Sequence, residues 1–251
     1  KINRRDFVRN AATVAAAVAL TGNRAFALGR PVPAINQLPR WRGFNLLDYF
    51  SPVPSGSDNR NRTTEDDLRW MADWGFDFVR VPMAYPRYLA IDRSKQVTRD
   101  DFYKIDRQVT DEIEQLVSMA NKHGLHVSLN LHRAPGYCIN AGFFEPFNLW
   151  KDKEAQDAFY YHWGMWAERF KNYSRDKLSF DLLNEPAYRE DMNDQFSKSQ
   201  PLQGDVYRNV ARGAADAIRK ANPDRIIVAD GNNVGNQVTP ELFDLDMGQS
   251  C

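Results

Sequence analysis

The chain has 251 residues, of which 43% are hydrophobic and 12% aromatic, and this composition excludes an intrinsically disordered protein. Its 33 basic and 33 acidic residues cancel, so the charge gives no reason to expect a nucleic-acid partner, and no apolar run reaches the roughly 18–20 residues of a membrane span. Two cysteines, Cys138 and Cys251, are too few for a disulfide scaffold or a structural zinc site.

Residues 1–27 are typical of an export signal. The stretch 3–9 (NRRDFVR) resembles the twin-arginine motif, residues 11–20 form a short apolar segment, and Ala25-Phe26-Ala27 resembles a cleavage site. The alternative is an amphipathic helix with a chance arginine pair. The segment carries five basic residues and one acidic residue, so the chain from Leu28 onward has a net charge of −4. We therefore expect a periplasmic or extracellular bacterial protein, for which a Cys138–Cys251 disulfide stays open and is not required for folding.

The body of the chain alternates predicted strands and helices. A first strand is expected at 41–47, and a helix at 65–74 begins after Thr63 and Thr64 and ends at Gly75. Thr110 is the expected cap of a further helix, which ends at Gly124. The other expected strands are 76–82, 125–131, 178–183 and 226–229, with a sixth starting at 245–249, and the other expected helices are 155–170 and 205–221.

Apolar strands that alternate with helices predict a parallel α/β sheet. A doubly wound open sheet and an eight-stranded α/β barrel both fit this pattern. No Gly-x-Gly-x-x-Gly and no phosphate-binding loop follows a predicted strand, which disfavours the nucleotide-binding version of the open sheet. No repeat or linker interrupts 28–251, so we expect one domain there, with its site in the loops at the carboxyl ends of the strands.

Polar side chains stand at the ends of three successive predicted strands. Arg80 lies at the end of the predicted strand 76–82, and His132 follows the predicted strand 125–131. Asn184-Glu185-Pro186 follows the predicted strand 178–183. A carboxylate at a strand end is held rigidly, and an arginine in an apolar strand needs an anion. Each residue also has a structural explanation: a turn with a solvated carboxylate for Glu185, a structural salt bridge for Arg80, and a core histidine for His132.

Four segments together resemble glycoside hydrolase family 5, a family of retaining cellulases and mannanases on a (β/α)8 TIM barrel. They are 42–45 (RGFN), 75–82 (GFDFVRVP), 131–133 (LHR) and 180–186 (FDLLNEP), and they occur in the family's order over about residues 40–250. The resemblance implies that Glu185 is the general acid/base and that Asn184 bonds the sugar 2-hydroxyl. It implies further that Arg80 orients the nucleophile and keeps it ionised, and that His132 contacts the sugar at the point of cleavage.

Four more residues are weaker candidates for substrate contact. They are Tyr137, after the third strand, Asn232 and Asn233, after the fifth, and Trp150. An indole can stack on a sugar face, although plain packing is the more common role for an aromatic at such a position. No cofactor is expected, and the spacing of His123, His126, His132 and His162 does not indicate a metal site.

The resemblance leaves half of the catalytic pair unplaced. A retaining glycosidase needs a second carboxylate about 5–5.5 Å from the first, and the family's nucleophile follows the seventh strand. Phe44 and Ile227 are 183 residues and four βα steps apart, so about the first five to six units of a barrel are expected here. Asp230 is the best geometric substitute, but its spacing argues against it.

We therefore expect a β-glucanase of the endoglucanase type, cut off before its nucleophile and inactive as a fragment. The alternative is an inactive carbohydrate-binding protein, which would leave an apolar sheet edge unpaired. The expected partner is a polysaccharide or oligosaccharide, bound by a monomer with no nucleic acid and, after signal cleavage, no membrane. The sequence does not decide between glucan and mannan or between endo and exo action.

Overall fold

The computed structural model describes residues 38–53, 62–138, 143, 145–192, 194 and 196–242. The chain divides into two units, 1–38 and 39–251, and everything below concerns the second. The predicted export signal at 1–27, the predicted sixth strand at 245–249 and Cys251 lie outside the described residues.

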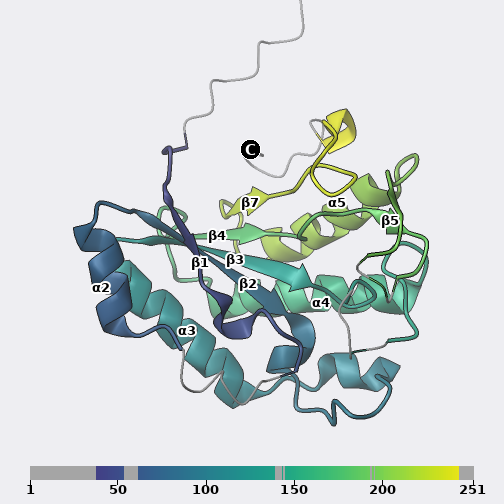
Figure 1. The fold of residues 1–251 in the computed structure, drawn as a ribbon, viewed down its shortest axis with the longest axis horizontal. Helices are drawn as coiled ribbons and strands as arrows, with labels where there is room; N and C mark the ends of the chain where they lie inside the picture. Colours follow the sequence, from purple (N-terminus) through teal and green to yellow (C-terminus); the bar gives the residue numbers. More distant parts are fainter. Residues whose placement is uncertain are drawn as a thin grey trace, which may run out of the picture. The chain divides into compact units, whose positions relative to one another are not determined.

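Five parallel strands form one sheet in the order β1-β2-β3-β4-β7 (Figure 1). Each predicted strand in the described range is confirmed: β1, β4 and β7 are shorter than predicted, β2 is displaced by two residues, and β3 begins one residue later and ends two residues later. Their bounds are Gly43–Asn45 (β1), Phe78–Ala84 (β2), His126–Arg133 (β3), Leu178–Asp181 (β4) and Ile226–Val228 (β7). A hairpin of two short antiparallel strands, which the sequence analysis did not predict, follows β4: Tyr188–Arg189 (β5) and Ser199–Gln200 (β6).

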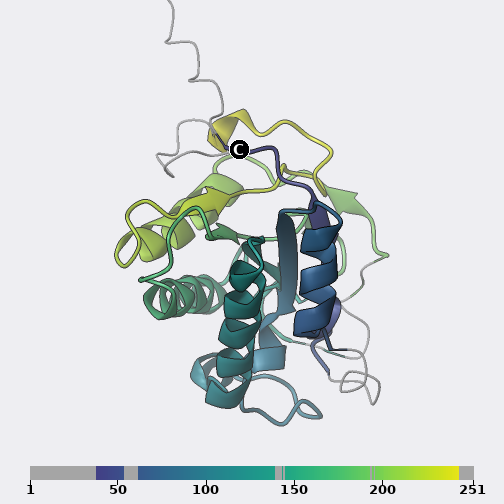
Figure 2. The same ribbon diagram turned by 90° about the vertical axis from the view of Figure 1, so that its left-hand side faces the viewer.

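Four α-helices connect these strands and follow one another in chain order beside the sheet (Figures 1 and 2). They are Glu65–Asp73 (α2), Arg107–Lys122 (α3), Lys153–Arg169 (α4) and Val206–Arg219 (α5). Short 3-10 helices lie at Leu47–Tyr49 (η1), Tyr85–Tyr88 (η2), Arg99–Tyr103 (η3) and Pro240–Leu242 (η4). No helix in the described ranges is long and apolar enough to cross a membrane.

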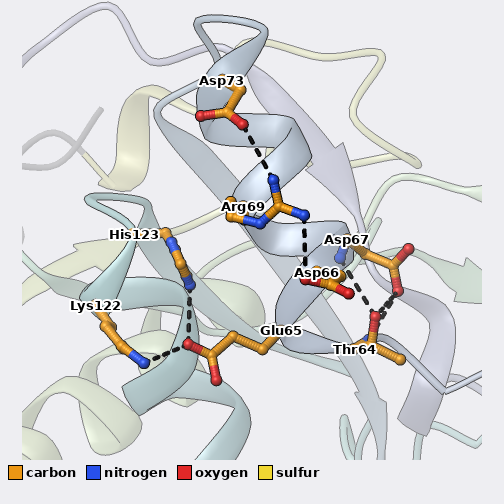
Figure 3. Close-up of polar contacts among 8 residues, drawn as sticks. All are labelled: Thr64, Glu65, Asp66, Asp67, Arg69, Asp73, Lys122 and His123. Carbon is orange, nitrogen blue, oxygen red and sulfur yellow. Dashed lines mark hydrogen bonds and ion pairs between the residues drawn. The ribbon is translucent and has the colours of Figure 1, made fainter.

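Helix α2 begins as its sequence predicts. The Thr64 side chain accepts a hydrogen bond from the Asp67 amide, and the Asp67 carboxylate accepts one from the Thr64 amide, which completes a capping box (Figure 3). Glu65 pairs with Lys122 and His123 at the far end of α3. Gly75 ends the segment with φ 84°, a left-handed conformation that glycine adopts without strain.

The predicted cap of α3 was wrong. Asp106 is the N-cap, and its carboxylate accepts hydrogen bonds from the amides of Gln108 and Val109. Thr110 lies one turn inside the helix, where its hydroxyl donates to the carbonyls of Asp106 and Arg107. A threonine that satisfies its hydroxyl on the preceding turn is tolerated inside a helix, so its type alone does not mark the start.

The core lies between the sheet and the helices. The aromatic residues Phe159, Trp163, Trp166 and Phe170 form the inner face of the α4 segment, and all are at most 1% exposed. The Trp163 indole N–H donates to the Leu182 carbonyl at 3.2 Å, just beyond β4. Burial of each large side chain contributes roughly 2–3 kcal/mol, and this packing fixes the strand ends that carry the candidate site.

Candidate active site

An arginine–aspartate pair joins two strands at the base of the candidate site. Arg80, in β2, donates from Nε to Oδ2 of Asp181 at 2.8 Å, and a second guanidinium nitrogen donates to Oδ1 of Asn184 at 3.0 Å. The anion beside Arg80 is therefore Asp181, which ends β4. The guanidinium also fixes the orientation of the Asn184 amide, because its oxygen faces Arg80.

The Asp181 carboxylate is buried. Burial raises its pKa to about 6, the charge on Arg80 acts in the opposite direction, and the charge on Asp230 adds to the rise. Its side chain is 6% exposed and that of Arg80 is 20% exposed. Asp181 thus serves as the buried counter-charge of Arg80 rather than as a carboxylate open to substrate.

His132 lies at the end of β3 beside Asn184. Burial lowers its pKa to about 3, and the charges on Arg133 and Arg80 lower it further, while a hydrogen bond with Asn184 opposes them. The ring lies 4.6 Å from that of Phe50, centroid to centroid. His132 is therefore neutral at any ordinary pH, which suits hydrogen bonding to a sugar hydroxyl better than proton transfer.

The backbone of Glu185 is held on both sides by side chains. Glu185 has φ 49°, a left-handed conformation that is unusual outside glycine. Its amide donates to Oδ2 of Asp230 at 3.0 Å, and its carbonyl accepts from the Tyr137 hydroxyl at 2.7 Å. Asp230 comes from the segment after β7 and Tyr137 from the segment after β3, so two neighbouring parts of the sheet edge aim this carboxylate.

The exposed Glu185 side chain faces a hollow of about 510 Å³, open solvent included. The residues that line it are His132, Arg133, Tyr137, Asn184, Glu185, Arg189 and Phe196. One carboxylate, one amide and one neutral imidazole therefore meet at one place. This set can donate a proton to, and hydrogen-bond, an uncharged polyhydroxyl ligand.

The structure does not bring all predicted substrate contacts to this hollow. Trp150 is 6% exposed, its indole N–H donates to the Ala187 carbonyl at 3.0 Å, and its ring packs edge-on against Tyr137. Trp150 therefore packs in the core in this structure, which is the alternative role given for it above. Asn232 is 4% exposed and bonds the backbone of Leu202 through both its amide oxygen and its amide nitrogen.

Asn233 is half-buried and lies in a turn. It has φ 53°, and its backbone amide donates to Oδ1 of Asn232 at 2.8 Å. Its side chain does not line the hollow.

Sequence reasoning missed several residues of the site. Asp181 could have been found from the sequence, because it is an aspartate at the end of an apolar strand, one strand away from Arg80 across β3, and a buried arginine needs an anion. Arg189 and Phe196 could not be found in this way, because the β5–β6 hairpin that places them was not predicted. No group of histidine, cysteine, aspartate or glutamate side chains within the described ranges is arranged to hold a metal ion.

Parallel strands covered by helices, with a carboxylate at their carboxyl ends, define the class of α/β-barrel proteins whose sites lie at that edge. The chain belongs to a family within this class. The family model for cellulase, glycosyl hydrolase family 5, matches residues 31–246. The family resemblance stated above is thereby confirmed, and the five strands correspond to part of its (β/α)8 barrel.

Relatives and solved structures agree with this assignment. The chain is 31% identical to Cellodextrinase A of Ruminococcus flavefaciens over 57% of its own length and 40% of that protein. It is 33% identical to Endoglucanase C of Acetivibrio thermocellus, over 57% of this chain and 39% of that one. A crystal structure of a glycoside hydrolase matches with a TM-score of 0.67 and 35% identity, over 81% of this chain and 56% of that chain. The chain thus spans about 40% of the length of these two curated relatives.

Proposed function

We propose that the protein containing this chain is a retaining β-glycosidase that cleaves β-1,4-linked glucan internally. The family assignment supports a glycosidase, and the named endoglucanase relatives favour glucan. The observation that carries the proposal is Glu185, which is exposed in the hollow with its backbone held at both its amide and its carbonyl.

In this mechanism Glu185 protonates the leaving oxygen and later activates water. Asn184 bonds the sugar 2-hydroxyl, and that bond strengthens as positive charge develops on the ring. The Arg80 guanidinium holds the Asn184 oxygen, so the amide nitrogen remains to face the substrate. Neutral His132 bonds a second hydroxyl without competing for the proton on Glu185.

The nucleophile is proposed to be a carboxylate other than Asp181 or Asp230. Asp181 forms an ion pair with Arg80, and Asp230 accepts a hydrogen bond from the Glu185 amide. Among the described residues that line the hollow, Glu185 is the one carboxylate. The retaining mechanism requires the nucleophilic carboxylate about 5–5.5 Å from Glu185. We propose that it also lies near Arg80, whose charge would lower its pKa and keep it ionised.

The test is hydrolysis of soluble β-1,4-glucan by the full-length protein. Glu185→Ala should lower kcat by about 10²–10⁴, the usual contribution of a general acid. Glu190→Ala is the matched control, because Glu190 is an exposed glutamate five residues later, directly after β5, and it should leave kcat within about twofold. Unchanged turnover in Glu185→Ala would remove Glu185 from the mechanism.

The stereochemistry of the first product tests the retaining part of the proposal. A nuclear magnetic resonance time course should show the β-anomer of the new reducing end first. Formation of the α-anomer first would establish an inverting mechanism. Binding of glucan with no product from the parent protein would indicate a carbohydrate-binding protein instead.

We also propose that residues 1–27 direct export through the twin-arginine route. The support is the order of the arginine pair, the apolar segment and the cleavage-site residues. A fusion of this segment to a folded reporter should reach the periplasm. Replacement of both Arg4 and Arg5 by lysine should stop that export, and continued export would contradict the assignment.

A further inference from the structure

A buried carboxyl group lies behind the site and takes no part in the mechanism above. Glu145, in the segment between β3 and α4, is 6% exposed. It interacts with the Tyr85 hydroxyl, with the Cys138 amide at 3.1 Å and with the backbone of Gly136. None of these partners is a cation, so the charge that glutamate normally carries has no counter-charge there.

The carboxyl group is therefore held in its protonated form. Burial raises the pKa of Glu145 to about 8, against the opposing effect of its hydrogen bonds. A protonated carboxyl has one donor and one acceptor face. It accepts a hydrogen bond from the Cys138 amide on Oε1 and is hydrogen-bonded to the Tyr85 hydroxyl through Oε2, so it connects η2 with the segment after β3.

That segment is a tight turn at residues 134–138. The Ala134 amide donates to the Tyr137 carbonyl at 3.2 Å, and the Tyr137 amide donates to the Ala134 carbonyl at 2.8 Å. Gly136 has φ 71°, and a Cβ atom there would stand 2.4 Å from the Leu149 amide nitrogen. The turn is therefore pressed against the start of α4 and has little room to move.

The turn carries the Tyr137 hydroxyl that holds Glu185. Cys138, which Glu145 anchors, is the next residue in the chain after Tyr137, and Tyr137 bonds the Glu185 carbonyl at 2.7 Å. A continuous set of contacts thus runs from Tyr85 through Glu145 and the turn to the left-handed backbone of Glu185. Loss of the anchor would remove one of the contacts that fix Tyr137 and so weaken its hydrogen bond to the Glu185 carbonyl.

We propose that Glu145 is a positioning residue for Glu185, acting through the 134–138 turn and the Tyr137 hydroxyl. This inference rests on the proposed role of Glu185 as the acid. A misplaced acid slows departure of a poor leaving group, such as a sugar alcohol. It matters little for a leaving group that departs without protonation, such as dinitrophenolate.

The leaving-group comparison is made in the full-length protein with Glu145→Ala and Tyr85→Phe. Both variants should lower kcat/KM on cellotetraose by about tenfold, and neither should change kcat/KM on dinitrophenyl β-cellobioside by more than about twofold. The comparison uses kcat/KM because it reports the first step, in which dinitrophenolate leaves without a proton from Glu185. Glu145→Gln keeps one acceptor and one donor and should restore most of the cellotetraose activity. Equal losses on the two substrates would overturn the proposal.

Tyr88→Phe is the matched control for Tyr85→Phe. Both tyrosines lie in η2 and are 0% exposed, but the Tyr88 hydroxyl bonds Nδ1 of His162 at 2.9 Å instead of Glu145. Tyr88→Phe should therefore affect both substrates alike. A selective loss on cellotetraose in this control would show that any buried hydroxyl in η2 has the same effect, which contradicts the proposed route.

Hydrogen exchange measures the positioning without any activity. The Glu185 amide donates to Asp230, and its exchange should speed up about tenfold in Glu145→Ala and Tyr85→Phe but not in Tyr88→Phe. Unchanged exchange in both test variants would overturn the inference. If the parent protein hydrolyses neither substrate, the proposed function fails, and this exchange measurement alone decides the role of Glu145. If Glu145→Ala does not fold, Tyr85→Phe carries both tests.

Discussion

Glu145 also makes the stability of the protein depend on pH in a calculable way. Its pKa in the folded chain is about 8, against an ordinary value of 4.5. Between these two values the folded chain holds a proton that the unfolded chain has released. The free energy of unfolding therefore falls as the pH rises through this window. At about 1.36 kcal/mol per pH unit, the loss is on the order of 5 kcal/mol.

The neighbours of Glu145 do not titrate in the same range. Burial raises the pKa values of the Tyr85 hydroxyl and the Cys138 thiol well above their ordinary values, so both stay neutral up to about pH 9. Asp181, with a pKa of about 6, contributes mainly below pH 6. Between pH 6.5 and 9 the difference between the parent and Glu145→Gln therefore isolates Glu145.

The assay is thermal unfolding of the parent and of Glu145→Gln from pH 5 to pH 9. Below pH 6.5 the buried His126, His132 and His162 titrate in the unfolded chain and act in the opposite direction. Between pH 6.5 and 8 the loss from Glu145 is about 2 kcal/mol, which lowers the Tm of the parent by on the order of 5 °C. The Tm of Glu145→Gln, whose side chain cannot ionise, should fall clearly less than the Tm of the parent between pH 6.5 and 9. Parallel curves for the two proteins would refute the reasoning, because Glu145 would then release its proton equally in the folded and unfolded chains.

Three further predictions concern other parts of the fold. Arg80→Ala leaves Asp181 buried without its counter-charge and should lower the free energy of unfolding by about 3–5 kcal/mol. The control Arg69→Ala, at an exposed ion pair on α2, should lower it by less than about 0.5 kcal/mol. Equal losses in urea titrations would contradict the burial argument. Thr64→Ala removes the capping box of α2 and should cost about 1 kcal/mol in the same titrations, and no measurable loss would show that the tertiary contacts of α2 alone hold its first turn. Because the pKa of His132 is about 3, His132→Asn should lower kcat/KM without moving the acidic limb of its pH profile, and a displaced limb would mean that His132 titrates during turnover.

Most of the architecture could be predicted from local patterns. Apolar runs marked all five sheet strands, and Gly75 and Gly124 marked the ends of α2 and α3, because a left-handed residue after a helix is a backbone requirement visible in sequence. The cap of α3 was misplaced, because a threonine hydroxyl can bond either the helix start or the preceding turn. The β5–β6 hairpin has two residues per strand, too few for a periodic pattern.

The candidate catalytic residues near the strand ends could be predicted from the sequence, whereas the contacts that hold them in place could not. Asn184 and Glu185 follow β4 within a few residues and His132 lies at the end of β3, so their position in sequence fixes their position at the sheet edge. The prediction that Arg80 ends its strand was wrong, because β2 continues to Ala84 and Arg80 lies inside it. The contacts of Tyr137 and Asp230 with the Glu185 backbone depend on how two loops fold back. The acidic group of Glu145 in an apolar pocket gives no local signal either, because a glutamate in a loop is normally solvated.

The double hold on Glu185 has a consequence for the order of folding. The residue is bonded to a side chain 48 positions earlier and to another 45 positions later. During synthesis the hydrogen bond from the Glu185 amide to Asp230 therefore cannot form until β7 and the residues after it have emerged. A nascent chain that ends shortly after β4 already contains Asn184, Glu185 and Pro186, but it lacks Asp230, which holds the Glu185 amide. The conformation of the Glu185 backbone thus depends on two contacts of long sequence separation, and such contacts form slowly in folding.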